Sequence, residues 1–139
     1  MNFFDTHTHI QFAAYDVDRD EVISRAKAAG VKMIVVGTQA QTSEDAIRLS
    51  HKYLEDIWAT VGFHPNHVTI PETNSRKSDW FHDKNEQKNS IPEEFDAKLL
   101  RWLAKDPKVV AIGECGLDYF RDKSQESRVR QKEVFLAQI

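Results

Sequence analysis

Short apolar runs alternate with stretches of helical periodicity along the chain, and this alternation limits the folds that it can adopt. Continuous apolar or β-branched runs predict strands at residues 2–5, 31–36, 57–61 and 109–113. Apolar residues at helical spacing predict helices at residues 18–29, 42–54, 93–105 and 124–139. A strand followed by a helix, four times over, predicts an α/β fold with a parallel sheet and right-handed crossovers.

Length, charge and cysteine content narrow the class of protein. The chain has 139 residues, about one domain, whereas a complete (β/α)8 barrel takes about 200 residues or more. The net charge of −3 disfavours a nucleic-acid binder that relies on bulk positive charge. The apolar runs are too short to cross a membrane, no signal peptide is apparent, and a single cysteine excludes an internal disulfide. We therefore expect a cytoplasmic protein with no membrane partner.

Particular residues predict where the helices end and which sides they bury. Gly30 is the expected C-cap of the first helix, and Ser43 is the expected N-cap of the second. The inward sides are predicted to include Leu54 in the second helix and Trp102 in the third. Residues 70–90 are mostly polar, so we interpret them as an insertion after the third strand, either a lid or a loose surface loop.

The first candidate site follows the first strand, in the segment Asp5-Thr6-His7-Thr8-His9. Alternate residues of a strand point to the same side, so His7 and His9 are expected to project together. Two adjacent imidazoles suit a divalent metal ion, and Asp5 on the same side would orient one of them. An isolated pair of this kind is also typical of an exposed polar strand end.

Two more polar groups follow later strands. Glu114 ends the fourth apolar run, where a carboxylate is readily solvated and can bind a metal ion, and His64 follows the third run. Either residue alone is typical of a surface turn. Together with His7 and His9, however, both lie at the carboxyl edge of one parallel sheet, where βα folds bind ligands. This convergence predicts a metal site.

The remaining histidines and the cysteine are weaker candidates for a functional site. His51, His67 and His82 are interpreted as ordinary histidines, because they lie on a helix, beyond a proline turn and in the insertion. Cys115 adjoins Glu114, but no base is placed to activate it as a nucleophile. The sequence has no Walker loop and no G-x-G-x-x-G motif, so a nucleotide cofactor is not expected.

Three segments, taken together, resemble the TatD family of metal-dependent deoxyribonucleases. They are Phe4-Asp5-Thr6-His7-Thr8-His9, Val61-Gly62-Phe63-His64-Pro65 and Ala111-Ile112-Gly113-Glu114-Cys115-Gly116-Leu117-Asp118-Tyr119. The tail from Gln131 to Ile139 is similar to that family's helix after its fourth strand. The resemblance covers the chain in order, and it implies half of a TIM barrel of the amidohydrolase type. Residues 1–139 would be its N-terminal half, four of eight βα units, with the insertion at about 70–90.

The resemblance also implies a function. By likeness, His7 and His9 hold one metal ion, and Glu114 bridges it to a second and takes part in catalysis. His64 lies near a substrate phosphate. Family members cleave phosphodiester bonds in DNA, often as 3′-to-5′ exonucleases. Two divalent cations, such as Zn²⁺, Mg²⁺ or Mn²⁺, activate water and stabilise charge on the attacked and leaving oxygens, so a basic protein surface is not needed.

The family's complete site implies ligands that this sequence does not match. Two further histidines and an aspartate come from the second half of the family's barrel, and none of the other histidines here stands at a matching position. We therefore expect weak or absent nuclease activity from this chain alone. Two alternatives stay open. One is a non-enzymatic half-barrel that forms a homodimer through its open sheet edges. The other is an amidohydrolase acting on a small ester, lactone or amide.

Overall fold

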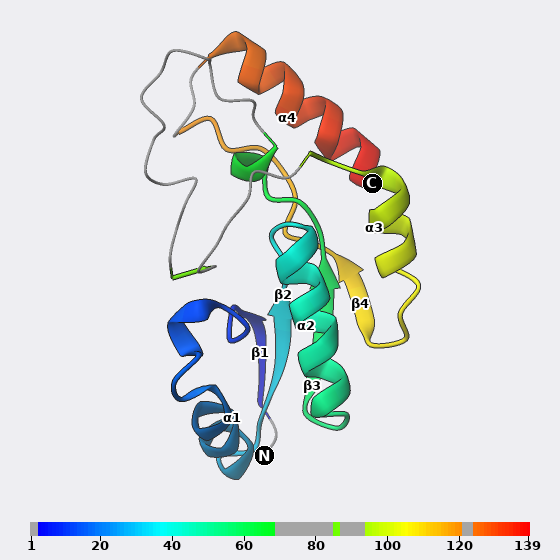
Figure 1. The fold of residues 1–139 in the computed structure, drawn as a ribbon. Coiled ribbons are helices and arrows are strands. Elements are labelled where there is room, and N and C mark those ends of the chain that lie inside the picture. The colour runs from blue at the N-terminus through cyan, green and yellow to red at the C-terminus, as the bar shows by residue number, and fades with distance from the viewer. Residues whose placement is uncertain (1–2, 69–84, 87–93, 121–123) are drawn as a thin grey trace.

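A computed structural model describes residues 3–68, 85–86, 94–120 and 124–139, and it contains a four-stranded parallel sheet (Figure 1). The strands are β1 (Phe3–Thr8), β2 (Val31–Val36), β3 (Ile57–Val61) and β4 (Val109–Ile112), and they lie side by side in chain order. The helices are α1 (Arg19–Ala28), α2 (Ala40–Lys52), α3 (Ala97–Leu103) and α4 (Gln125–Gln138). Two short 3-10 turns, η1 (Ala13–Tyr15) and η2 (Pro65–His67), follow β1 and β3. The predicted α/β fold with a parallel sheet is confirmed.

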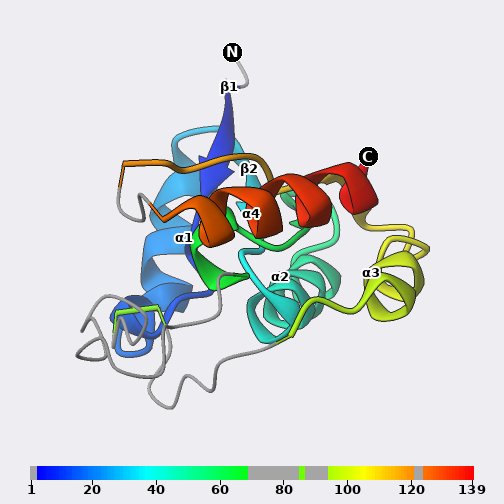
Figure 2. The same cartoon turned by 90° about the horizontal axis from the view of Figure 1, so that it is seen from above.

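The helices cover one face of the sheet, where the core lies. Seen from above, α1, α2 and α3 form an arc along the sheet, and α4 crosses over its carboxyl edge (Figure 2). Met33, Val35 and Ile57 are buried beneath α1 and α2, as expected for strand residues that alternate in direction. On the opposite face Phe4 of β1 lies 5.4 Å from Trp58 of β3, ring centre to ring centre, and Phe4 is 53% exposed. The sheet is therefore covered on one face and open on the other.

The first strand and the third helix have other boundaries than the sequence predicts. The first strand runs on to Thr8, because its pairing with β2 continues past Asp5 after an irregularity in register. The third helix begins only at Ala97, because the carboxylate of Asp96 caps it by accepting from the backbone N–H groups of Lys98 and Leu99. By contrast, Gly30 directly follows the C-cap residue Ala29 and has a φ of 71°, so the prediction that this glycine ends the first helix is confirmed.

The second helix does not begin at Ser43, so this prediction was wrong. The N-cap is Gln39, and the hydroxyl of Thr42 accepts from the backbone N–H of Gln39 at 3.0 Å. Ser43 is buried inside the helix, where its hydroxyl accepts from the backbone N–H of Gly62 at 3.3 Å. A Cβ at Gly37 would lie 2.3 Å from the Ser43 oxygen, so the chain after β2 passes close to α2 only because residue 37 is glycine.

Two residues predicted to face inward are exposed. Leu54 is 59% exposed because α2 ends at Lys52, and the residues beyond it no longer follow the helix stripe. Trp102 is 66% exposed because Leu100 and Leu103 form the buried side of the short helix α3. The predicted insertion at 70–90 lies outside the described residues, apart from Asn85 and Glu86. Among the described helices, none is long and apolar enough to cross a membrane.

Candidate metal centre

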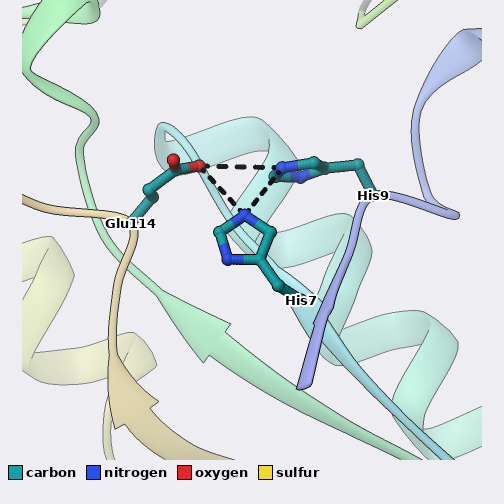
Figure 3. Close-up of side chains that lie close together, drawn as sticks. All are labelled: His7, His9 and Glu114. Carbon is teal, nitrogen blue, oxygen red and sulfur yellow. Dashed lines mark hydrogen bonds and ion pairs between the residues drawn. The ribbon is translucent and has the colours of Figure 1, made fainter. Parts of the chain in front are cut away.

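His7, His9 and Glu114 come together at the carboxyl edge of the sheet, as predicted (Figure 3). The Nε2 atoms of the two histidines are 3.2 Å apart, and the Oε2 atom of Glu114 lies 3.8 Å and 3.7 Å from them. A triangle of this size leaves room for an ion about 2 Å from each atom, which is the length of a zinc–nitrogen or zinc–oxygen bond. The donor set of two imidazoles and one carboxylate fits a divalent cation.

The ring of His9 is fixed in the tautomer that a metal ligand needs. Its Nδ1 lies 3.0 Å from the carbonyl oxygen of Val36. A carbonyl can only accept, so Nδ1 carries the proton, and the lone pair of Nε2 faces His7 and Glu114. The ring of Phe12 stacks on His9 with its centre 4.5 Å away and the planes 18° apart. These two contacts set the orientation of His9 before any ion binds.

The ring of His7 is less restrained, since 56% of its side chain is exposed. Asp5 was expected to orient one of the histidine rings. Its carboxylate instead accepts from the backbone N–H of His7 at 3.2 Å, so it acts on the main chain of the strand end. The two histidines therefore differ in how firmly the protein holds them.

Glu114 reaches the site because the chain after β4 passes very close to the loops of its neighbours. Its backbone N–H donates to the carbonyl of Gly37 at 2.8 Å, and the hydroxyl of Thr60 donates to the carbonyl of Gly113 at 2.8 Å. A Cβ at Gly62 would lie 2.6 Å from the carbonyl carbon of Gly113. The close approach therefore depends on Gly62 of the preceding unit having no side chain.

His64 lies on the other side of Glu114, with its Nε2 3.8 Å from Oε1 of that carboxylate. Its Nδ1 accepts from the backbone N–H of Asn66 at 3.1 Å, so the proton of the neutral ring is on Nε2. Burial lowers the pKa of His64, and this outweighs the opposite effect of Glu114. His64 is thus a neutral ring that offers an N–H donor beside the carboxylate.

Of the three remaining histidines, the two that the structure describes do not belong to the group formed by His7, His9 and Glu114. His51 is far from the site in the fold: its Nε2 lies 2.9 Å from both carboxylate oxygens of Asp106, at the amino edge of the sheet. His67 was interpreted as ordinary, but it lies near His64, with Nε2 3.3 Å from a carboxylate oxygen of Glu86. His82 lies outside the described residues.

Burial raises the pKa of the Cys115 thiol, which keeps it a poor nucleophile.

Two glutamines of α4 hold the loops of the site, and the sequence analysis missed both. The side-chain amide of Gln138 donates to the carbonyl of Phe63 and accepts from its N–H, at 3.1 Å and 2.8 Å. Gln131 makes the same pair of bonds to the backbone of Asp118, at 2.9 Å and 2.8 Å. Their spacing of seven residues puts them on one side of the helix, and this was the available signal.

Comparison with known proteins agrees with this geometry. Residues 4–139 match the family described as TatD related DNase. The chain belongs to this family. The 3′-5′ ssDNA/RNA exonuclease TatD of Erwinia amylovora is 35% identical over 137 residues, which cover 98% of this chain and 44% of that protein. A Bacillus subtilis protein named uncharacterized metal-dependent hydrolase YabD is 38% identical over the same shares.

Solved TatD structures share the fold. The TatD homologue YJJV of Escherichia coli K12 matches with a TM-score of 0.68 at 28% identity, covering 98% of this chain and 44% of that one. A TatD-family hydrolase of Entamoeba histolytica matches in fold with a TM-score of 0.62 at 22% identity. The chain thus spans less than half the length of these TatD relatives, and the predicted half-barrel is confirmed.

Proposed function

We propose that this chain provides the first half of a TatD-type active site that hydrolyses phosphodiester bonds in DNA, as a 3′-to-5′ exonuclease. The observation that carries the proposal is the convergence of His7, His9 and Glu114 on one point at the carboxyl edge of the sheet. The family and the names of its TatD relatives supply the substrate class. We assign metal binding to all three residues and a catalytic role to Glu114.

The chain's own residues have separate tasks in this proposal. His9 presents an unprotonated Nε2 atom, Nε2 of His7 lies 3.2 Å from it, and Glu114 adds a carboxylate oxygen that favours a cation between them. Divalent cations bound there, two in the complete site, supply a Lewis acid and lower the pKa of water. His64 directs its Nε2–H past Glu114, where it would donate to a phosphate oxygen and orient the scissile bond.

A chimera tests this proposal directly. Residues 1–139 would replace the matching 44% of the Bacillus subtilis relative, so that the other half of the barrel is present. We expect hydrolysis of single-stranded DNA that is abolished by a chelator and by His7→Ala. The chain alone should show weak or no activity, because it brings three ligands to the site. Strong chelator-sensitive hydrolysis by the chain alone, lost in His7→Ala, would contradict the need for further ligands. A chimera that binds metal but cleaves no DNA would contradict the assigned function.

A second candidate function is self-association of a half-barrel, and the open face of the sheet favours it. β1 and β4 are the outer strands of the sheet, and the large apolar residues Phe3, Phe4 and Val110 on them are more than half exposed. A second copy would cover this surface by pairing β4 of one chain with β1 of the other. Light scattering decides the matter: a clean monomer of 16.1 kDa would rule out the dimer.

A further inference from the structure

Asn85 and Glu86 attach to the chain just after β1. The backbone N–H of Ala13 donates to the carbonyl of Glu86 at 3.0 Å, and the N–H of Ala14 donates to the carbonyl of Asn85 at 2.8 Å. Ala13 directly follows Phe12, whose ring stacks on His9. The segment therefore adjoins the loop that orients one of the metal-binding histidines.

The side chain of Glu86 continues from this attachment to two other loops. One carboxylate oxygen accepts from the hydroxyl of Thr38, which follows β2, and the other lies 3.3 Å from Nε2 of His67, which follows β3. Only 12% of the Glu86 side chain is exposed. Glu86 thus joins the loops that leave three successive strands, through its backbone carbonyl after β1 and through its largely buried carboxylate after β2 and β3.

Both partners of the carboxylate also contact His64. The carbonyl of Thr38 accepts from the backbone N–H of His64 at 2.7 Å. The rings of His64 and His67 meet edge to face, with centres 6.0 Å apart. Contacts of Glu86 therefore lead to His9 through Ala13 and Phe12, and to His64 through Thr38 and His67.

We propose that Glu86 is a positioning residue of the candidate metal centre, which fixes the loops bearing His9 and His64 in the arrangement that binds a cation and a phosphate. This inference rests on the proposed function of the site. The residue lies within the range interpreted as an insertion, and its contacts give Glu86 itself a role in the site. Removing the carboxylate would take one acceptor from Thr38 and the partner of His67, and would thereby loosen the attachment of Asn85 and Glu86 to the loop after β1.

The charge of Glu86 suits this role. Burial raises the pKa of the carboxyl group, but the hydrogen bond and charge of His67, the hydroxyl of Thr38 and the charge of His9 outweigh burial and hold the pKa below its usual value. The group is therefore ionised at neutral pH. A largely buried ionised carboxylate depends on its partners, so the loss of either partner should destabilise this arrangement.

The test compares Glu86→Ala and Glu86→Gln with Glu44→Ala, which removes an exposed carboxylate from α2. Zinc affinity is measured by calorimetry, and amide hydrogen exchange is followed at Ala13 and Ala14. In Glu86→Ala we expect faster exchange at both amides and about 10-fold weaker zinc binding, the size of effect seen when a group behind a metal ligand is removed. Glu86→Gln keeps an acceptor for Thr38 and should lose less affinity, and Glu44→Ala should lose none.

Thr38→Val provides a milder variant in case Glu86→Ala does not fold, since it removes only the hydroxyl and should weaken zinc binding in the same direction. If Glu86→Ala folds, an unchanged zinc affinity in this variant would overturn the proposal. If Glu86→Ala does not fold, an unchanged zinc affinity in Thr38→Val would overturn it. Equal amide exchange in Glu86→Ala and the parent chain would also overturn it, even if the parent binds no zinc. Failure of the parent to bind zinc, with faster exchange in Glu86→Ala, would instead refute the proposed function and leave Glu86 as a brace of the three loops.

Discussion

Each edge of the sheet carries a contact between histidine and carboxylate, and the two contacts are built differently. At the amino edge, Nε2 of His51 lies 2.9 Å from both oxygens of Asp106. At the carboxyl edge, Glu114 stays 3.7 Å and 3.8 Å from the nitrogens of His9 and His7, which is too long for a hydrogen bond. At the amino edge the histidine and the carboxylate bond to each other. At the carboxyl edge the carboxylate of Glu114 stays apart from the two histidines and leaves a space between the three side chains.

The residues at the carboxyl edge are held in place by further contacts from the surrounding loops. The His9 ring is held from behind by the Val36 carbonyl and the Phe12 ring, and the loop of Glu114 is held by Gly37 and Thr60. These groups hold His9 and Glu114 in place, and Nε2 of His7 lies within hydrogen-bond distance of Nε2 of His9, at 3.2 Å. Fixed donors around an open space are what a metal site requires, and a closed ion pair is what a surface contact provides.

The largest expected effect comes from removing a ligand at the carboxyl edge. His9→Ala should weaken zinc binding by more than about 100-fold, beyond the range typical of residues that only support a ligand. His51→Ala is the matched control, because it removes a histidine of the closed pair. Calorimetric titration with zinc measures both variants, and equal losses in the two would remove the distinction between the edges.

The next effect tests the support of the site from α4. Gln138→Ala leaves the buried N–H and carbonyl of Phe63 without partners and should lower the free energy of unfolding by about 1–3 kcal/mol. Gln125→Ala, at an exposed position of the same helix, should change it little. Urea denaturation followed by circular dichroism gives both values. A Gln138→Ala protein as stable as the parent would show that these bonds do not hold the loop.

A smaller effect is expected at the amino edge. His51→Ala breaks a partly exposed pair and should cost no more than about 1 kcal/mol of unfolding free energy. Its zinc affinity should stay that of the parent chain. Urea denaturation measures the change, and a loss as large as that of Gln138→Ala would mean that the pair is structural in its own right.

The smallest effect is a pH dependence. Burial opposes ionisation of Asp106, but hydrogen bonds from His51 and the backbone N–H of Lys108 outweigh it and hold the pKa of the carboxyl below its usual value. The pair therefore stabilises the fold above about pH 4, and this contribution is lost as the pH falls through the lower folded pKa. In Asp106→Asn the unfolding free energy should fall less steeply below about pH 4. Identical acid titrations for the two proteins would contradict this.

The sequence predicted which side chains converge at the site better than it predicted the residues that support them. Strand alternation and the order of the elements were enough to bring His7, His9 and Glu114 to one edge, because both depend on local periodicity. The partner of a side chain far away in the sequence has no such signal. The contact of Glu86 with Thr38 spans 48 residues, and that of Gln138 with Phe63 spans 75. These contacts required the fold itself.

The sequence also predicted helix ends and inward-facing residues incompletely, because these too depend on tertiary contacts. Ser43 is a typical N-cap residue, but the side chain of Thr42 takes part in capping, and Ser43 turns inward to Gly62. Trp102 fits an apolar stripe by spacing, yet the short helix α3 buries Leu100 and Leu103 instead. Residue type predicted that an element exists, and tertiary packing decided which residue caps it and which side it buries.

The central claim is that His7, His9 and Glu114 form a partial metal centre. X-ray absorption at the zinc edge, combined with elemental analysis of the purified chain, tests it most directly. The account predicts weak zinc binding by the chain, of no more than one ion but more than none, with two imidazole nitrogens in its coordination shell. Both the zinc and these ligands should be lost in the double variant His7→Ala, His9→Ala. Two tightly bound zinc ions per chain, or zinc that keeps its imidazole ligands in the double variant, would contradict it.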